Sequence, residues 1–152
     1  MSSTITGLAV PDFSAPMTSG KTFKLSEYLG NHVVLYFYPK DSTPGCTNES
    51  IQFNELLKSF KRKKCLLFGI SRDSLKSHEN FRSKYEFKFD LISDSDEAIC
   101  QMFDVIKMKN MYGKQVRGIE RSTFLIDPAG ILKKEWRKVS VGGHAQEVLE
   151  SI

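Results

Sequence analysis

The pattern of hydrophobic and polar positions contains two continuous apolar runs, "HVVLYFY" (residues 32–38) and "CLLFGIS" (residues 65–71). Both are rich in β-branched and aromatic residues, which predicts strands that are buried on both faces of a sheet. Between them, residues 44–64 mix apolar and polar side chains with the period of a helix. The apolar positions that set this period are Phe53, Leu56, Leu57 and Phe60.

The rest of the chain continues the alternation of strands and helices. Ser74 is a suitable N-cap for a helix that runs to about Tyr85. The segment "SDSDEAICQMFDV" (residues 93–105) predicts a capped helix, and we expect three of its residues to face the core: Ala98, Met102 and Val105. The remaining predicted elements are an extended N-terminal segment with Pro11 and Pro16, a helical turn at 25–29, strands at 89–93, 121–127 and 131–139, a turn at 128–130 and a closing helix at 144–152.

Strands that alternate with helices predict an α/β sandwich whose central strands are parallel, and the hairpin near the end makes the sheet mixed. The 152 residues suit one domain, which we expect to span residues 1–152. In such sheets the functional site lies beyond the C-terminal ends of the strands, often at a helix N-terminus. The segment "PKDSTPGC" (residues 39–46), directly after the first apolar run, occupies such a place.

Composition narrows the partners and the compartment. The 22 basic and 18 acidic residues leave a net charge of +4, too small and scattered to indicate a nucleic-acid partner. No apolar run approaches the roughly 20 residues of a membrane helix, and the first residues lack the pattern of a signal peptide. The chain has three cysteines and no CxxC motif, so we expect a reducing, cytoplasmic setting in which an unusually placed cysteine is reactive.

Cys46 is that unusually placed cysteine. Thr43 followed by Pro44 predicts an N-cap and the first helical residue, so Cys46 falls in the first turn. Free backbone N–H groups and the helix dipole favour a thiolate there. Gly45 leaves room for a close approach to the backbone, and the Thr43 hydroxyl can hold a small polar substrate.

Several uses of such a thiolate are disfavoured by what the sequence lacks. Disulfide exchange normally needs a second cysteine nearby, and the residues three before and three after Cys46 are Thr43 and Glu49. Acyl transfer needs a histidine base, and we interpret each histidine as a surface or capping residue: His32, His78 and His144. Metal-binding spacing around Cys46 is absent, which leaves attack on a peroxide O–O bond.

The residues at this point resemble a known family. Pro39-x-x-x-Thr43-x-x-Cys46 is the peroxiredoxin active-site pattern, and "YFYPKDSTPGCTNE" resembles the bacterioferritin-comigratory, or Q-type, peroxiredoxins. The resemblance extends over nearly the whole chain through "PDF", "GISRDS", "LISDSDE" and "GIERSTFLID". It implies a thioredoxin-like fold and a monomeric antioxidant enzyme that reduces hydrogen peroxide and organic hydroperoxides with thiol reductants and without a cofactor.

The resemblance also implies residue roles. Cys46 matches the peroxidatic cysteine, Thr43 the residue whose hydroxyl bonds the peroxide, and Pro39 the proline that shields the pocket from water. Arg121 matches the arginine that stabilises the thiolate and the transferred oxygens, a role that suits a permanently charged guanidinium. Glu49 matches a residue common in the family's first helix, which we interpret as a structural or tuning partner.

The positions that would regenerate Cys46 depart from the family pattern. The two usual places for a resolving cysteine are occupied here by Ile51 and Arg82. Cys65 begins an apolar strand and fits a core role, as does Cys100 in its helix, although Cys100 is the one plausible internal resolver. If the Cα atoms of Cys46 and Cys100 do not lie within about 7 Å, such a disulfide needs local unwinding of the first helix, which the resemblance implies is tolerated. We favour a single-cysteine enzyme that glutathione, a glutaredoxin or thioredoxin recycles through a mixed disulfide.

Two functions of other classes remain as alternatives to a peroxidase. A peroxide-sensing redox protein with little turnover is compatible with the absent resolver. A thioredoxin-like disulfide reductase is disfavoured by the missing CxxC motif.

Overall fold

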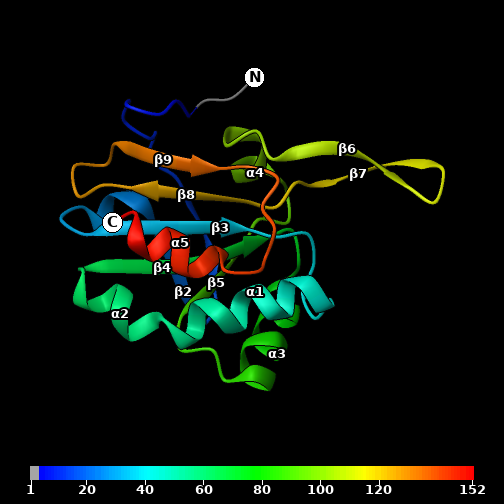
Figure 1. The fold of residues 1–152 in the computed structure, drawn as a ribbon, viewed down its shortest axis with the longest axis horizontal. Coiled ribbons are helices and arrows are strands. Elements are labelled where there is room, and N and C mark those ends of the chain that lie inside the picture. Colours follow the sequence, from blue (N-terminus) through cyan, green and yellow to red (C-terminus); the bar gives the residue numbers. More distant parts are fainter. Residues whose placement is uncertain (1–3) are drawn as a thin grey trace.

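A computed structural model describes residues 4–152, so the first three residues of the predicted domain lie outside the description. It contains a seven-stranded sheet in the order β2-β1-β5-β4-β3-β8-β9 (Figure 1). The strands of this sheet are β1 (Ser14–Met17), β2 (Lys21–Lys24), β3 (His32–Phe37), β4 (Cys65–Ser71), β5 (Asp90–Ser93), β8 (Ser122–Ile126) and β9 (Leu132–Trp136). The helices are η1 (Leu25–Tyr28), α1 (Pro44–Glu55), α2 (Leu57–Arg62), α3 (Leu75–Tyr85), α4 (Ala98–Met102) and α5 (His144–Glu150).

The centre of the sheet confirms the predicted mixed α/β architecture. Strands β3, β4 and β5 are parallel, while β8 pairs antiparallel with β3 and β9 pairs antiparallel with β8. The parallel strands end at the same edge of the sheet, which therefore collects the loops that follow β3 and β4. The loop after β3 leads directly into α1.

The two faces of the sheet carry separate hydrophobic cores. Alternate residues of β3 divide between them, with Val33 and Leu35 in one core and Val34 and Tyr36 in the other. The second core is completed by side chains of α1, α2, α3 and α5, and the first by residues from β2, η1 and α4. This division decides which cysteines can meet.

The structure differs from two helix predictions. The helix predicted for residues 44–64 divides into α1 and α2 at Leu56, whose backbone (φ −96°, ψ 3°) leaves the helical region. The Leu56 N–H donates to the carbonyls of both Gln52 and Phe53, which is the hydrogen-bond pattern of a tightened turn. Ala98 is exposed, contrary to prediction, because α4 turns Ile99 and Cys100 inward instead.

A second hairpin, β6 (Ile106–Met111) and β7 (Lys114–Ile119), was not predicted. Figure 1 shows it extending away from the seven-stranded sheet. Most of its residues are exposed, so neither face needs an apolar stripe, and the alternation of apolar and polar residues at 106–109 is too short to predict a hairpin. Within residues 4–152, none of the helices has the length and apolar character needed to cross a membrane.

Candidate active site

The first turn of α1 carries Cys46 as predicted. Thr43 is the N-cap, with extended backbone (φ −84°, ψ 153°), and Pro44 begins the helix. The Thr43 hydroxyl does not cap the helix but donates to the Lys40 carbonyl at 2.9 Å. Its oxygen lone pairs remain able to accept a hydrogen bond from a substrate O–H. The Cys46 side chain is 1% exposed, so access to its sulfur is narrow.

Arg121 reaches this turn from the opposite half of the chain. The antiparallel pairing of Phe37 with Ser122 places Arg121 beside the end of β3, where the loop to α1 begins. Its Nη2 donates to Cys46 Sγ at 3.5 Å, and its Nη1 donates to a carboxylate oxygen of Glu49 at 2.6 Å. A Cβ on Gly45 would lie 3.2 Å from Nη2, so the room predicted at this glycine is the room that the guanidinium occupies.

Glu49 is part of the site and is almost completely buried, with 1% exposure. Burial raises the pKa of Glu49 to about 7, although the charge and hydrogen bond of Arg121 act in the opposite direction. Burial alone would lower the pKa of Arg121, but the charges of Glu49 and Cys46 outweigh it and the pKa is raised. Oxygen Oε2 of Glu49 is buried without a hydrogen-bond partner among the described residues.

The raised pKa of Glu49 has a consequence for stability. Because the carboxyl has a pKa of about 7 when folded and 4.5 in its ordinary state, it destabilises the fold progressively as the pH rises between these values. The difference in free energy of unfolding between Glu49→Gln and wild type should therefore grow in favour of the variant as the pH rises. From about pH 4 to about pH 8 the increase should be on the order of 3 kcal/mol. Denaturant unfolding at both pH values measures this.

The exposed Glu55 at the end of the same helix supplies the matched control. Glu55→Gln should follow the wild-type pH dependence. A Glu49→Gln variant whose stability also runs parallel to wild type would show that the Glu49 carboxyl does not change its protonation on folding.

The loop between β3 and α1 is anchored by a buried polar network. Asp41 accepts from the Tyr38 hydroxyl at 2.6 Å and lies 2.7 Å from His78 Nδ1, and its N–H donates to Asp73 at 2.9 Å. His78 Nε2 lies 2.9 Å from the Ile92 carbonyl. The ligand atoms of Asp41, Asp73 and His78 are close enough to hold a metal ion, but each is already engaged in these hydrogen bonds. The network fixes the loop that contains the half-buried Pro39.

The surface interpretation of two histidines was wrong. His78 is 0% exposed, because α3 packs against β5 and turns it toward Asp41. His144 is 4% exposed at the start of α5 and lies 2.8 Å from the Thr123 hydroxyl, and burial lowers its pKa. Both have structural hydrogen-bond partners, and neither lies within hydrogen-bond distance of Cys46.

The other cysteines are buried in the two cores. Burial raises the pKa of Cys65 to about 12 and that of Cys100 further, so both thiols stay protonated. Cys65 shares the core of Cys46, whereas Cys100 belongs to the core on the other face of the sheet. The structure therefore does not bring Cys100 and Cys46 together.

The usual positions of a resolving cysteine hold other ordered side chains. Ile51 is half-buried in α1 against the core of Cys46. Arg82 in α3 donates to the Phe89 carbonyl at 2.9 Å and lies 3.7 Å from the Asp90 carboxylate. Arg82 thus ties α3 to β5.

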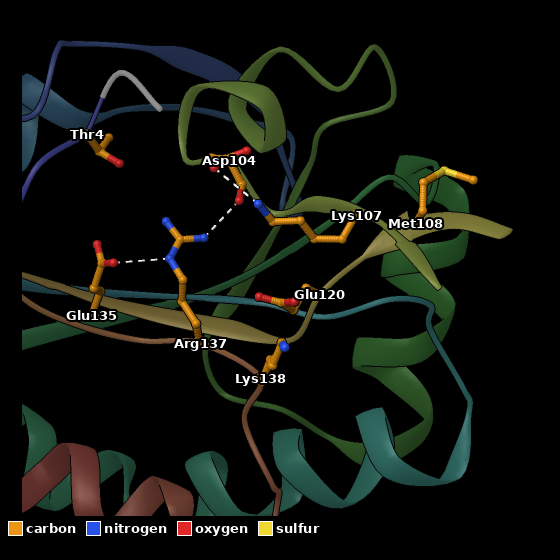
Figure 2. Close-up of a pocket in the computed structure, with 8 residues that line it drawn as sticks. All are labelled: Thr4, Asp104, Lys107, Met108, Glu120, Glu135, Arg137 and Lys138. Carbon is orange, nitrogen blue, oxygen red and sulfur yellow. Dashed lines mark hydrogen bonds and ion pairs between the residues drawn. The ribbon is translucent and has the colours of Figure 1, made fainter. Parts of the chain in front are cut away.

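An open hollow of about 680 Å³ lies near the base of the β6–β7 hairpin. Figure 2 shows Lys107 and Arg137 pointing toward Asp104 inside it, with Glu120 and Lys138 at its edge. None of the predicted site residues lines this hollow, so it is separate from the candidate site.

Comparisons with known proteins identify the family of the chain. Residues 6–135 match the AhpC/TSA family. The Peroxiredoxin Bcp of Xanthomonas campestris is 54% identical over 141 residues, which cover 93% of this chain and 88% of the relative. The Peroxiredoxin Bcp of Bacillus subtilis is 45% identical over 146 residues, or 96% of this chain and 93% of the relative.

Solved structures show the same similarity. A structure of the Xanthomonas campestris bacterioferritin comigratory protein, described for its alkyl peroxide reduction activity, superposes with a TM-score of 0.90 at 51% identity and covers 97% of this chain and 96% of that one. The peroxidoxin BcpB of Mycobacterium tuberculosis superposes with a TM-score of 0.86 at 32% identity, covering 97% and 96%.

Proposed function

The chain belongs to the AhpC/TSA family and is a peroxiredoxin of the Bcp (PrxQ) subfamily, a thiol-dependent peroxidase, and from this membership we propose that Cys46 is its peroxidatic residue. The observation that carries the assignment is the guanidinium of Arg121, which donates to the Cys46 sulfur at 3.5 Å. Lys63 acts on Cys65 and Arg72 on Cys100 only through their charge, and among residues 4–152 no cation donates a hydrogen bond to either sulfur.

The geometry suits attack on a peroxide. The Cys46 thiolate attacks one oxygen, an S–O bond forms as the O–O bond breaks, and the departing oxygen leaves as an alkoxide or hydroxide that takes a proton. Arg121 faces the sulfur and stabilises the negative charge that moves onto the oxygens. Thr43 accepts from the peroxide O–H, and the half-buried Pro39 is assigned the role of shielding the site from water because it matches the proline of the family pattern.

The proposed substrates are hydrogen peroxide and organic hydroperoxides. The relative from Xanthomonas campestris is described as reducing alkyl peroxides, and we extend this activity to the present chain. A small, polar O–O group suits a sulfur that is only 1% exposed.

We propose that an external thiol regenerates Cys46. Ile51 and Arg82 occupy the usual resolving positions, and Cys100 lies in the other core. Glutathione, a glutaredoxin or thioredoxin would then form a mixed disulfide with Cys46 and release it by a second exchange. The enzyme would act as a monomer in the cytoplasm, where a reducing thiol pool is available.

One equivalent of peroxide, followed by mass mapping of the cysteines under non-reducing conditions, tests this assignment. We expect a sulfenic acid on Cys46 alone, and a mixed disulfide on Cys46 when glutathione is present. A Cys46–Cys100 linkage would contradict the single-cysteine cycle, and oxidation confined to another cysteine would contradict the site. Rapid oxidation with no recycling by any of the three reductants would favour the sensor.

A further inference from the structure

The site presents one cation to two acidic groups. The Arg121 guanidinium donates to Cys46 Sγ at 3.5 Å and to Glu49 Oε1 at 2.6 Å. Cys46 and Glu49 are each 1% exposed, so water screens neither of them. Two buried anions that share a single cation are costly, and such a pair normally keeps one proton. When Cys46 is the reactive thiolate, that proton belongs on Glu49.

The hydrogen bonds of Glu49 indicate which oxygen carries the proton. Oε1 accepts from Arg121, which it can do as a carboxylate or as the carbonyl oxygen of a neutral acid. Oε2 is buried and has no hydrogen-bond partner among residues 4–152, so its O–H is free to donate. Glu49 follows Cys46 by three residues in α1, a spacing that places both side chains on one face of the helix.

We propose that Glu49 stores the proton that the departing oxygen of the hydroperoxide takes up when Cys46 attacks. The inference rests on the proposed function of Cys46. Thiolate, hydroperoxide and neutral carboxyl become sulfenic acid, alcohol and carboxylate, so atoms balance and the total charge stays at one negative unit. Arg121 faces the thiolate before the reaction and the carboxylate after it. The proton moves directly or through one water.

The same group is reloaded during recycling. After a first thiol has formed a mixed disulfide with Cys46 and released water, a second thiol attacks that disulfide. The second thiol gives its proton to the Glu49 carboxylate, its sulfur bonds to the first, and Cys46 leaves as a thiolate. The starting pair of thiolate and neutral carboxyl is restored without a further reactant.

The charged and titratable groups around the pair leave Glu49 as the acid that fits this role. Three other titratable groups act on this cluster from the elements packed around it. They are Tyr36 on β3, Lys109 on β6 and His144 on α5. Burial raises the pKa of Tyr36 well above its usual value and lowers that of His144, so both are neutral near pH 7. Burial lowers the pKa of Lys109, but its ammonium group donates to the Ile119 carbonyl, whereas Glu49 shares the Arg121 guanidinium with Cys46.

Peroxides with different departing groups test the proposal. A peroxyacid such as peracetic acid releases a carboxylate, which is stable without a proton, whereas tert-butyl hydroperoxide releases a basic alkoxide that needs one. The variant Glu49→Gln keeps the shape and an oxygen for Arg121 but cannot give up a proton. We expect its rate constant for Cys46 oxidation to fall about 100-fold with tert-butyl hydroperoxide and to stay near wild type with peracetic acid. Glu55→Gln should match wild type with both.

The ratio of the two rate constants is the decisive quantity, because the folded fraction and the thiolate fraction cancel in it. With the peroxyacid rate constant referred to the neutral peroxyacid, this ratio, alkyl hydroperoxide over peroxyacid, should fall in wild type as the pH rises through about 7, and in Glu49→Gln it should not depend on pH. An equal loss with both oxidants would overturn the proposal and leave Glu49 as a residue that only positions Arg121. No loss with either would overturn it as well. If wild-type Cys46 is oxidised by neither peroxide, the proposed function itself fails.

Discussion

Replacing Cys46 with serine should abolish thiol-dependent peroxide consumption. A serine hydroxyl has the shape to fill this buried position but is not ionised near neutral pH, and it is a far weaker nucleophile than a thiolate. The other two thiols cannot substitute, since burial raises the pKa of both Cys65 and Cys100. Peroxide loss in the presence of dithiothreitol should fall to the rate of the reductant alone.

Cys100→Ala is the matched control for the cysteine variant. Because Cys100 lies in the core on the other face of the sheet, this variant should keep its turnover with dithiothreitol and with glutathione plus glutaredoxin. Thermal unfolding should confirm that both variants remain folded. Turnover that persists in Cys46→Ser would refute the site, and turnover lost in folded Cys100→Ala would restore Cys100 as a resolver.

The central strands were predictable because their pattern is extreme. Continuous apolar runs at β3 and β4 have no reasonable place except the middle of a sheet covered on both faces. The β6–β7 hairpin was missed for the opposite reason, since most of its residues are exposed and its burial is confined to the base near Ile119, so no buried face marks its period. Ala98 was misplaced because the five residues of α4 are too few to define a face.

The site residues also differ in how far their arrangement could be predicted, because some depend on neighbouring residues and others on distant ones. Thr43, Pro44 and Cys46 act through the geometry of one helical turn, so their arrangement follows from the sequence. The contact of Arg121 with Cys46 spans 75 residues and depends on the pairing of β8 with β3, which no local pattern specifies. Without the family pattern, Arg121 could not have been separated from other arginines of the chain.

Burial of polar residues was the least predictable property. His78 lies on a helix whose other residues are mostly polar, and its contact with Asp41 arises only when α3 packs beside the loop after β3. Glu49 likewise belongs to a largely polar helix, yet it is enclosed together with Cys46. A sequence identifies such residues as polar, while the packing of distant elements decides whether they are buried.

Arg121→Gln should lower the rate constant for Cys46 oxidation by about 100- to 1000-fold, the loss typical when a preorganised donor is removed from developing negative charge. Two effects add, because the variant loses both the charge beside the sulfur and the pair of directed N–H groups that hold Cys46 and Glu49 together. The rate constant of Arg121→Lys should lie between those of wild type and Arg121→Gln, since an ammonium group keeps the positive charge but not the pair of directed guanidinium N–H groups. Stopped-flow fluorescence or competition kinetics with hydrogen peroxide measures the rate constants.

Arg117 supplies the control for these arginine variants, because it is exposed on β7 and pairs with Glu97 rather than with the site. Arg117→Gln should oxidise at the wild-type rate, and an equal loss there would assign the effect to net charge alone. The double variant Arg121→Gln, Glu49→Gln adds a sharper criterion. Without its cation, the buried Glu49 carboxyl has no reason to ionise and cannot release its proton, so removing it should cost little more. Losses that simply multiply would show that Arg121 and Glu49 act independently, against the single-cation arrangement that joins them to Cys46.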